Sequence, residues 1–163
     1  MMIGEAPGFH ENRVGRPFVG AAGSFLEELL ASINMRREDV YICNVIKCRP
    51  PNNRDPLPNE IEACAPYLDR QIELVKPRLI VTLGRHSMAK FLPRTMISKV
   101  HGQAKMVGQW LVLPLFHPAA ALHQPKYRAD IEKDILRIPQ VLAQMDGVEV
   151  AEPDQRGEQL TLF

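Results

Sequence analysis

The sequence has few cysteines, almost no net charge and no long apolar run. Its three cysteines, an odd number, and the absence of a signal-peptide pattern at the start argue against a disulfide framework and predict a cytoplasmic protein. No run approaches the ~18 apolar residues of a transmembrane helix, so we expect no membrane contact. The formal net charge is only +1. Any binding of nucleic acid must therefore come from a local basic patch.

Nucleotide-binding signatures, internal repeats and low-complexity tracts are also missing. Glycines cluster at Gly4, Gly8, Gly20 and Gly23, but neither the Rossmann nor the Walker spacing occurs. These glycines serve tight turns and close packing, or let backbone N–H groups approach a base edge or a phosphate. A nucleotide-binding module is the weakest of the interpretations.

What is present fits one globular domain. The chain has 163 residues, of which 45% are hydrophobic and 24% charged. We assign residues 1–145 to the domain and residues 146–163 to a flexible polar tail, and we expect a monomer.

Apolar periodicity predicts alternating strands and helices. Expected strands are 1–4, 40–46, 79–83 and a hairpin over 106–116, whereas expected helices are 24–33, 59–75, 85–92 and 128–144. Residues 5–18 read as a loop, and Pro66 should kink or interrupt its helix. The alternation predicts a mostly parallel sheet with helices on both faces.

The segment from Asn44 to Arg54 carries the most specific signal. Asn44 ends a strand, at the sheet edge where α/β proteins bind ligands, and Pro50 and Pro51 then break the ladder. The cations Lys47, Arg49 and Arg54 follow. This mixture suits a site that holds an anionic polymer beside a neutral, hydrogen-bonding target.

Single residues after the strands allow two interpretations each. Phe18 is a core residue that anchors its loop, or an aromatic platform under a flat base. Asn44 caps a turn, or its amide reads an imide edge such as that of uracil. His117 is structural, or donates to an oxygen on which negative charge develops. Glu5, Asn44 and His117 each follow a strand, so we expect their loops to converge in one pocket.

The cysteines and the last five residues also allow more than one interpretation. Cys48 and Cys64 are small buried hydrophobes, or they are two ligands of a metal site that would need two further ligands. Cys43 reads as structural. Gln159-Leu160-Thr161-Leu162-Phe163 is a linear motif for a partner groove or a chance composition.

Several long motifs together resemble the family 4 uracil-DNA glycosylases, the iron–sulfur enzymes of bacteria and archaea. They are Gly4-Glu-Ala-Pro-Gly8 with Glu11, Gly15-Arg-Pro-Phe-Val-Gly-Ala-Ala-Gly23, Asn44-Val-Ile-Lys-Cys-Arg-Pro-Pro-Asn-Asn-Arg54 and His117-Pro-Ala119. The resemblance implies a three-layer α/β/α fold. It also implies a DNA repair glycosylase that flips uracil out of DNA, hydrolyses its N-glycosidic bond and leaves an abasic site.

The resemblance also implies roles for single residues. Phe18 would stack on uracil, Asn44 would bind its N3/O4 edge, and His117 would face O2. The loop with Gly4 and Ala6 would close the pocket. Water positioning or loop geometry would fall to Glu5, Glu11 and Asn53, and DNA contacts to Lys47, Arg49, Arg54 and Leu122. Ala6 stands where another branch of the superfamily has an aspartate base.

Departures from the family pattern concern the cluster and the DNA contact. Cys48 and Cys64 match two of the four ligands of a [4Fe–4S] cluster, and the family's Cys-x-x-Cys pair would precede the first strand. We expect a truncated start, because Met1 to Ile3 reads as a strand cut in the middle. Asn12 stands where the family often has aspartate. Ala121-Leu122-His123 replaces a bulkier residue and an arginine, which predicts a weaker phosphate contact.

Partners and alternatives complete the expectations. Gln159, Leu160, Leu162 and Phe163 resemble the pentapeptide that binds the bacterial sliding clamp. The leading hypothesis is uracil excision from DNA. The alternatives are a glycosylase of broader base range and an inactive protein that only binds uracil-containing DNA.

Overall fold

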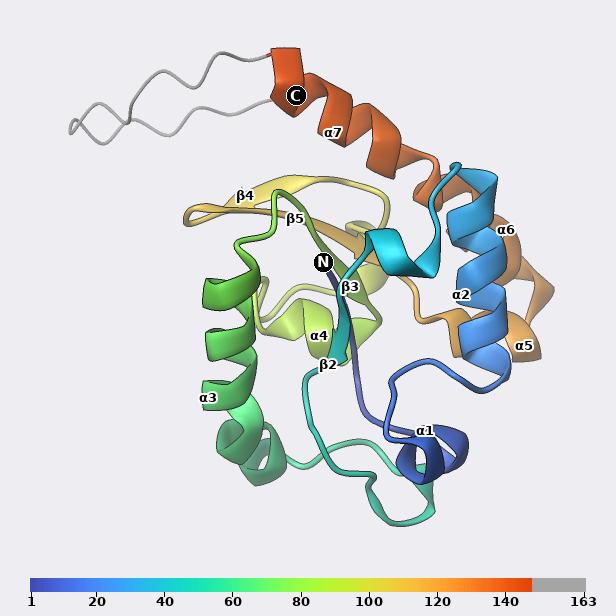
Figure 1. The fold of residues 1–163 in the computed structure, drawn as a ribbon, viewed down its shortest axis with the longest axis vertical. Coiled ribbons are helices and arrows are strands. Elements are labelled where there is room, and N and C mark those ends of the chain that lie inside the picture. The colour runs from blue at the N-terminus through green and yellow to red at the C-terminus, as the bar shows by residue number, and fades with distance from the viewer. Residues whose placement is uncertain (148–163) are drawn as a thin grey trace.

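A five-stranded sheet forms the centre of the computed structural model, which describes residues 1–147 (Figure 1). The strand order is β2-β1-β3-β5-β4, and only the β4–β5 pair is antiparallel. The strands are β1 (Met2–Gly4), β2 (Ile42–Asn44), β3 (Ile80–Leu83), β4 (Lys105–Val107) and β5 (Trp110–Leu115). The predicted α/β fold with a mostly parallel sheet is confirmed.

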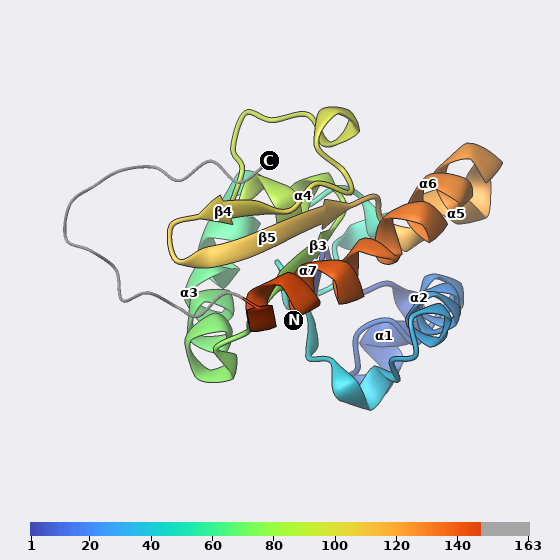
Figure 2. The same cartoon turned by 90° about the horizontal axis from the view of Figure 1, so that it is seen from above.

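Helices cover both faces of this sheet (Figures 1 and 2). They are α1 (Phe9–Val14), α2 (Ala21–Ser32), α3 (Pro58–Val75), α4 (Arg85–Ala89), α5 (Pro118–His123), α6 (Pro125–Ile135) and α7 (Arg137–Gly147). Neighbouring residues of one strand point to opposite faces. In β3, Val81 packs in the cluster with α2 and α6, whereas Ile80 packs in the cluster with α3. Two apolar cores therefore enclose the sheet, and the fold has three layers.

Three element predictions were wrong in part. Residues 5–18 contain the short helix α1, whose ends are set by Gly8 and by Gly15 at φ 75°. Pro66 lies inside α3, which continues from Pro58 to Val75, so the expected interruption is wrong and the kink stays a prediction; Leu68 and Ile72 bury one face of the helix and offset the lost hydrogen bond. The expected last helix is two helices. Pro139 is tolerated only in a first turn, and α7 accordingly starts anew at Arg137.

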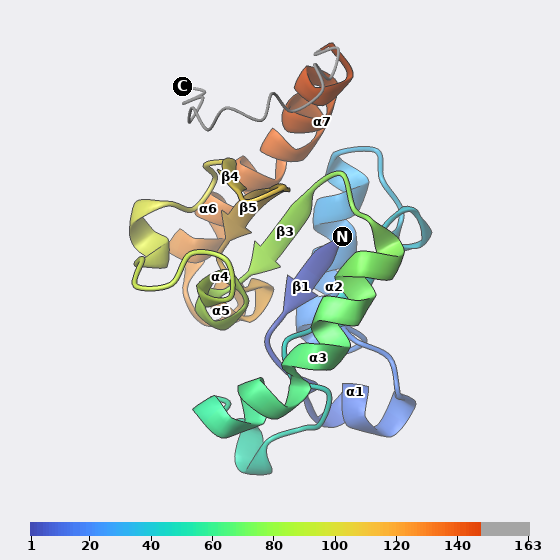
Figure 3. The ribbon, with the colours of Figure 1, turned by 90° about the vertical axis from the view of Figure 1, so that its left-hand side faces the viewer.

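The parallel strands all point toward one end of the sheet. Figure 3 shows α1, α5 and the segment that leads into α3 gathered at that end. The loops after β1, β2 and β5 therefore meet there, as predicted for an α/β sheet. Within residues 1–147, no helix is long and apolar enough to cross a membrane. The tail assigned to 146–163 lies outside the described residues from position 148 onward.

Candidate functional site

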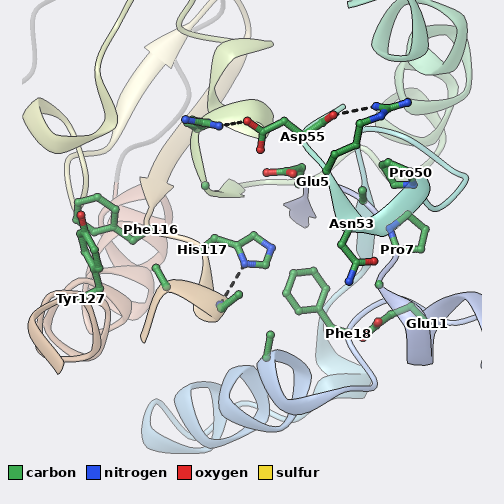
Figure 4. Close-up of a pocket in the computed structure, with 18 of the residues that line it drawn as sticks. Glu5, Pro7, Glu11, Phe18, Pro50, Asn53, Asp55, Phe116, His117 and Tyr127 are labelled. Atoms are coloured by element: carbon green, nitrogen blue, oxygen red, sulfur yellow. Dashed lines mark hydrogen bonds and ion pairs between the residues drawn. The ribbon is translucent and has the colours of Figure 1, made fainter. Parts of the chain in front are cut away.

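A pocket of about 590 Å³ opens at the carboxyl end of the sheet. Its walls come from the loop after β1, from residues 50–55 and from the start of α5 (Figure 4). Glu5, Ala6, Glu11, Phe18, Asn53, Arg54 and His117 are among the lining residues. The structure thus brings these seven predicted site residues together, whereas Gly4, Asn44, Lys47, Arg49 and Leu122 are not among the residues that line the pocket.

Gly4 allows a close approach of Asn44, which does not line the pocket, to Phe18, which does. Gly4 pairs with Asn44 across β1 and β2. A Cβ at Gly4 would lie 2.5 Å from Asn44 Oδ1 and 2.6 Å from Phe18 Cε2, so no larger residue fits without displacing one of them. Figure 4 shows His117 directed toward Phe18, and the two rings stack with centroids 5.5 Å apart at 25°.

Asn44 is a buried polar residue with an unused oxygen. Its relative exposure is 6%, and Oδ1 has no hydrogen-bond partner among the described residues. An unpaired buried polar group costs about 1–3 kcal/mol, so structures seldom keep one without a reason. The Asn44 oxygen is therefore a buried acceptor that residues 1–147 leave without a partner, although Asn44 itself does not line the pocket.

Phe18 has an unusual backbone that two neighbours stabilise. Its φ is 53°, the left-handed region that non-glycine residues rarely adopt. Arg37 Nη1 donates to the Phe18 carbonyl at 2.7 Å, and Nη2 donates to the Pro17 carbonyl. A Cβ at Gly23 would lie 2.0 Å from the Phe18 carbonyl oxygen, so only glycine allows this approach.

Sequence reasoning missed both supports of Phe18. Arg37 lies 19 positions from Phe18 in a polar stretch, where no pattern distinguishes it from a solvated surface cation. Gly23 stands out in the sequence only as part of a glycine-containing motif. Its need for glycine depends on a carbonyl that folding brings near.

His117 is held neutral with a defined tautomer. Burial lowers its pKa to about 4, although the charge on Glu11 acts in the opposite direction. The Ala119 N–H donates to His117 Nδ1 at 3.1 Å. Nδ1 is therefore an acceptor, and the proton of the neutral ring lies on Nε2. Nε2 can donate to a ligand oxygen.

The two glutamates of the first loop have different environments. Glu11 Oε1 accepts from the N–H groups of Val19 and Gly20, both at 2.9 Å. Burial alone would raise its pKa, but these and other backbone donors lower it overall. Glu11 thus stays ionised and fixes the loop that carries Phe18.

Glu5, by contrast, has a raised pKa. Burial is the main cause, and the nearby Asp55 adds to it, whereas His86 and Arg85 oppose it. The Glu5 carboxylate lies 3.9 Å from His86 Nε2 and lines the pocket. It is a partly buried acceptor that no backbone donor occupies among the described residues. A water molecule is a suitable partner for it.

The cations after Asn44 are less free than their sequence suggests. Lys47 Nζ donates to the Asn44 carbonyl at 2.7 Å and to Gln71 Oε1 at 2.6 Å, and burial lowers its pKa. Arg54 forms a two-point ion pair with Glu60, at 2.7 and 2.8 Å. Arg49 Nε donates to Asn53 Oδ1 at 2.7 Å. Their predicted DNA contacts stay predictions.

The three cysteines also differ in their burial and in their environments. Cys43 is buried in β2, and burial raises its pKa to about 11, so it stays a thiol. Cys48 is exposed, and Cys64 Sγ accepts from the N–H of Lys47, directly before Cys48, at 3.4 Å. N–H groups directed at sulfur are typical of Fe–S sites. Cys48 and Cys64 therefore fit half of a four-thiolate site, and the 163-residue sequence holds no further cysteine besides Cys43.

Comparison with known proteins agrees with this site. The pattern of the uracil DNA glycosylase superfamily matches residues 1–137. A type-4 uracil-DNA glycosylase of Archaeoglobus fulgidus is 51% identical, over 85% of this chain and 74% of that protein. Those of Sulfurisphaera tokodaii and Saccharolobus solfataricus are each 47% identical, over 85% and 88% of this chain and 67% and 71% of theirs. The chain belongs to the uracil DNA glycosylase superfamily and, within it, to the type-4 uracil-DNA glycosylases.

Proposed function

We propose that the chain is a DNA repair hydrolase that removes uracil from DNA. The observation that carries the proposal is the buried amide of Asn44, whose oxygen has no partner among residues 1–147 although it lies against Phe18 and Gly4. Uracil offers an N3–H donor beside the O4 acceptor, which matches the acceptor and donors of one amide. Cytosine has an N4 donor in place of O4 and no N3–H. The same amide orientation therefore rejects it.

His117 and Phe18 complete the recognition of a flipped base. Breakage of the N-glycosidic bond leaves an oxocarbenium-like sugar and a uracil anion. The Nε2–H of neutral His117 donates to the oxygen on which that charge develops, without giving up its proton. Phe18 supplies the stacking surface that replaces the neighbouring bases of the duplex.

Glu5 positions the attacking water in this proposal. Its carboxylate lines the pocket and retains free acceptor capacity. Glu11 acts through loop geometry, because its Oε1 accepts two backbone N–H groups. Asn53, from the facing loop, is directed toward Phe18 and helps to close the pocket (Figure 4). Leu122, on α5 and 47% exposed, enters the space that the base leaves.

The type-4 family typically carries a [4Fe–4S] cluster. In this chain, Cys48 and Cys64 would supply two of its four thiolate ligands. The bound cluster would link the loop after β2 to α3 and thereby fix the approach to Asn44. We assign it no part in the cleavage of the base.

The test is release of uracil from a single-stranded and a double-stranded oligonucleotide with one deoxyuridine, followed by alkaline cleavage at the abasic site. We expect cleavage of both, and none of an oligonucleotide with deoxycytidine or thymidine at the same position. Cleavage of hypoxanthine or ethenocytosine at similar rates would instead show a broader base range. A gel shift with no cleavage would show a binding protein and contradict the proposal.

The last five residues, which lie outside the described part of the chain, are the proposed contact with the bacterial sliding clamp. Gln159, Leu160, Leu162 and Phe163 carry the motif. Deletion of residues 159–163 should abolish capture of the chain by immobilised clamp and leave uracil release unchanged. Undiminished capture would contradict the proposal.

A further inference from the structure

Helix α1 contributes nothing to either core. None of its six residues is buried. Phe9 is 49% exposed and Val14 is 60% exposed, so the helix presents apolar side chains to solvent beside the pocket. The inward side of the same segment belongs to the site, because Gly8 and Glu11 line the pocket.

Two arginines from different elements flank the exposed ring. Arg13 Cζ lies 5.7 Å from the centroid of Phe9, and Arg49 Cζ lies 5.3 Å from it. Neither guanidinium forms an ion pair with a carboxylate within residues 1–147. Arg49 reaches back to Asn53, which lines the pocket. The Phe9 ring and its two cations, neither of which is paired with a carboxylate within residues 1–147, are therefore linked to the base pocket through Asn53.

This combination is the one that proteins use to bind single strands, in which bases stack on aromatic rings while cations meet the backbone. We propose that Phe9 stacks on a nucleobase next to the flipped uracil, on the same strand, and that Arg13 and Arg49 contact the flanking phosphates. The inference rests on the proposed function, because the strand is placed by the base in the pocket.

Stacking is tested with 2-aminopurine, a base whose fluorescence reports its neighbours. Two oligonucleotides carry it directly 5′ or directly 3′ of a 2′-fluoro-deoxyuridine, whose fluorine suppresses cleavage. We expect the intact protein to change the fluorescence at one of the two positions, and Phe9→Leu to abolish that change and weaken binding about tenfold. Leucine keeps the apolar character, so only the aromatic face is lost. Tyr67→Leu, which removes an aromatic residue of 66% exposure on α3, is the matched control and should change neither signal.

The phosphate contact is tested by the salt dependence of binding. Arg13→Gln should reduce the slope of log affinity against log salt concentration by about 0.7 on single-stranded DNA, the value for one phosphate. Arg13 forms no hydrogen bond or ion pair with a pocket residue within residues 1–147, so the rate of uracil release at saturating DNA should not fall.

The outcomes separate this inference from the function on which it rests. Cleavage by the intact protein with unaltered fluorescence and affinity in Phe9→Leu would overturn the role of α1 and leave the function standing. An unchanged salt slope in Arg13→Gln would overturn the phosphate contact. Absence of uracil release by the intact protein would instead overturn the proposed function.

Discussion

The inner wall of the pocket and its outer rim are built in opposite ways. Phe18, on the wall, and Asn44, behind it, are 5% and 6% exposed, and the backbone of each accepts a hydrogen bond from a cation, Arg37 or Lys47. On the rim, Phe9 and Leu122 are 49% and 47% exposed. Rigid buried groups discriminate one base from another, because a wrong partner leaves them unpaired. Exposed groups suit a DNA strand whose sequence varies.

Removal of the buried amide should give the largest effect. Asn44→Ala should lower the rate constant of uracil release by about 100- to 1000-fold, as loss of one preorganised donor does. The free energy of unfolding should fall by no more than about 1 kcal/mol, because the lost side chain includes an oxygen without a partner. Single-turnover cleavage and thermal unfolding measure the two. A large loss of stability with an unchanged rate would contradict the prediction, because it would mean that Asn44 serves the stability of the fold and not the recognition of uracil.

His117 should make the stability of the fold depend on pH. Its pKa is about 4 in the folded chain, against 6.5 in an unfolded one. Between these values only the unfolded chain binds the proton, so the free energy of unfolding falls as the pH drops from 6.5 to 4. The contribution is about 3 kcal/mol, from 1.36 kcal/mol per pKa unit.

The matched variant is His117→Asn, which does not titrate and retains a side chain suited to cap α5. Urea denaturation at pH 7, 5.5 and 4 should show that the loss of stability toward acid is smaller in this variant than in the intact chain. Equal losses in both would mean that the imidazole already titrates normally in the fold, and that it is not held neutral for donation.

Loss of the Arg37 hydrogen bonds that support the backbone of Phe18 should have a smaller effect on both the rate of uracil release and the stability of the fold. Arg37→Gln removes two charge-assisted hydrogen bonds to the Pro17 and Phe18 carbonyls. We expect the free energy of unfolding to fall by about 2 kcal/mol, and uracil release to slow by about tenfold as the strained backbone of Phe18 relaxes. Arg36→Gln is the control, since the Arg36 side chain is highly exposed and, within residues 1–147, its one ion pair is with Asp39. Similar losses of stability and rate in both variants would argue against a specific role of Arg37 in supporting Phe18.

The same contrast explains what the sequence could predict. Alternation of apolar residues indicated the sheet and both cores, and local motifs indicated Phe18, Asn44 and His117. Arg37, Gly23 and the inward direction of Lys47 depend on contacts between segments distant in sequence, which no local pattern encodes. Helix α1 was missed because it buries nothing. Without an apolar stripe, periodicity has no signal to detect.

Lys47 offers the finest test, because sequence and structure assign it different positions. As a DNA contact, Lys47→Met should reduce the salt slope of binding to duplex DNA by about 0.9. As a support of the Asn44 carbonyl, the variant should leave the slope unchanged and slow uracil release a few-fold, because Nζ lies 2.7 Å from that carbonyl and 2.6 Å from Gln71. We expect the second result. Gln71→Leu, which removes the other partner of the Lys47 ammonium, should then slow uracil release to a similar extent. A reduced salt slope in Lys47→Met would instead show that Lys47 contacts DNA and does not serve to support Asn44.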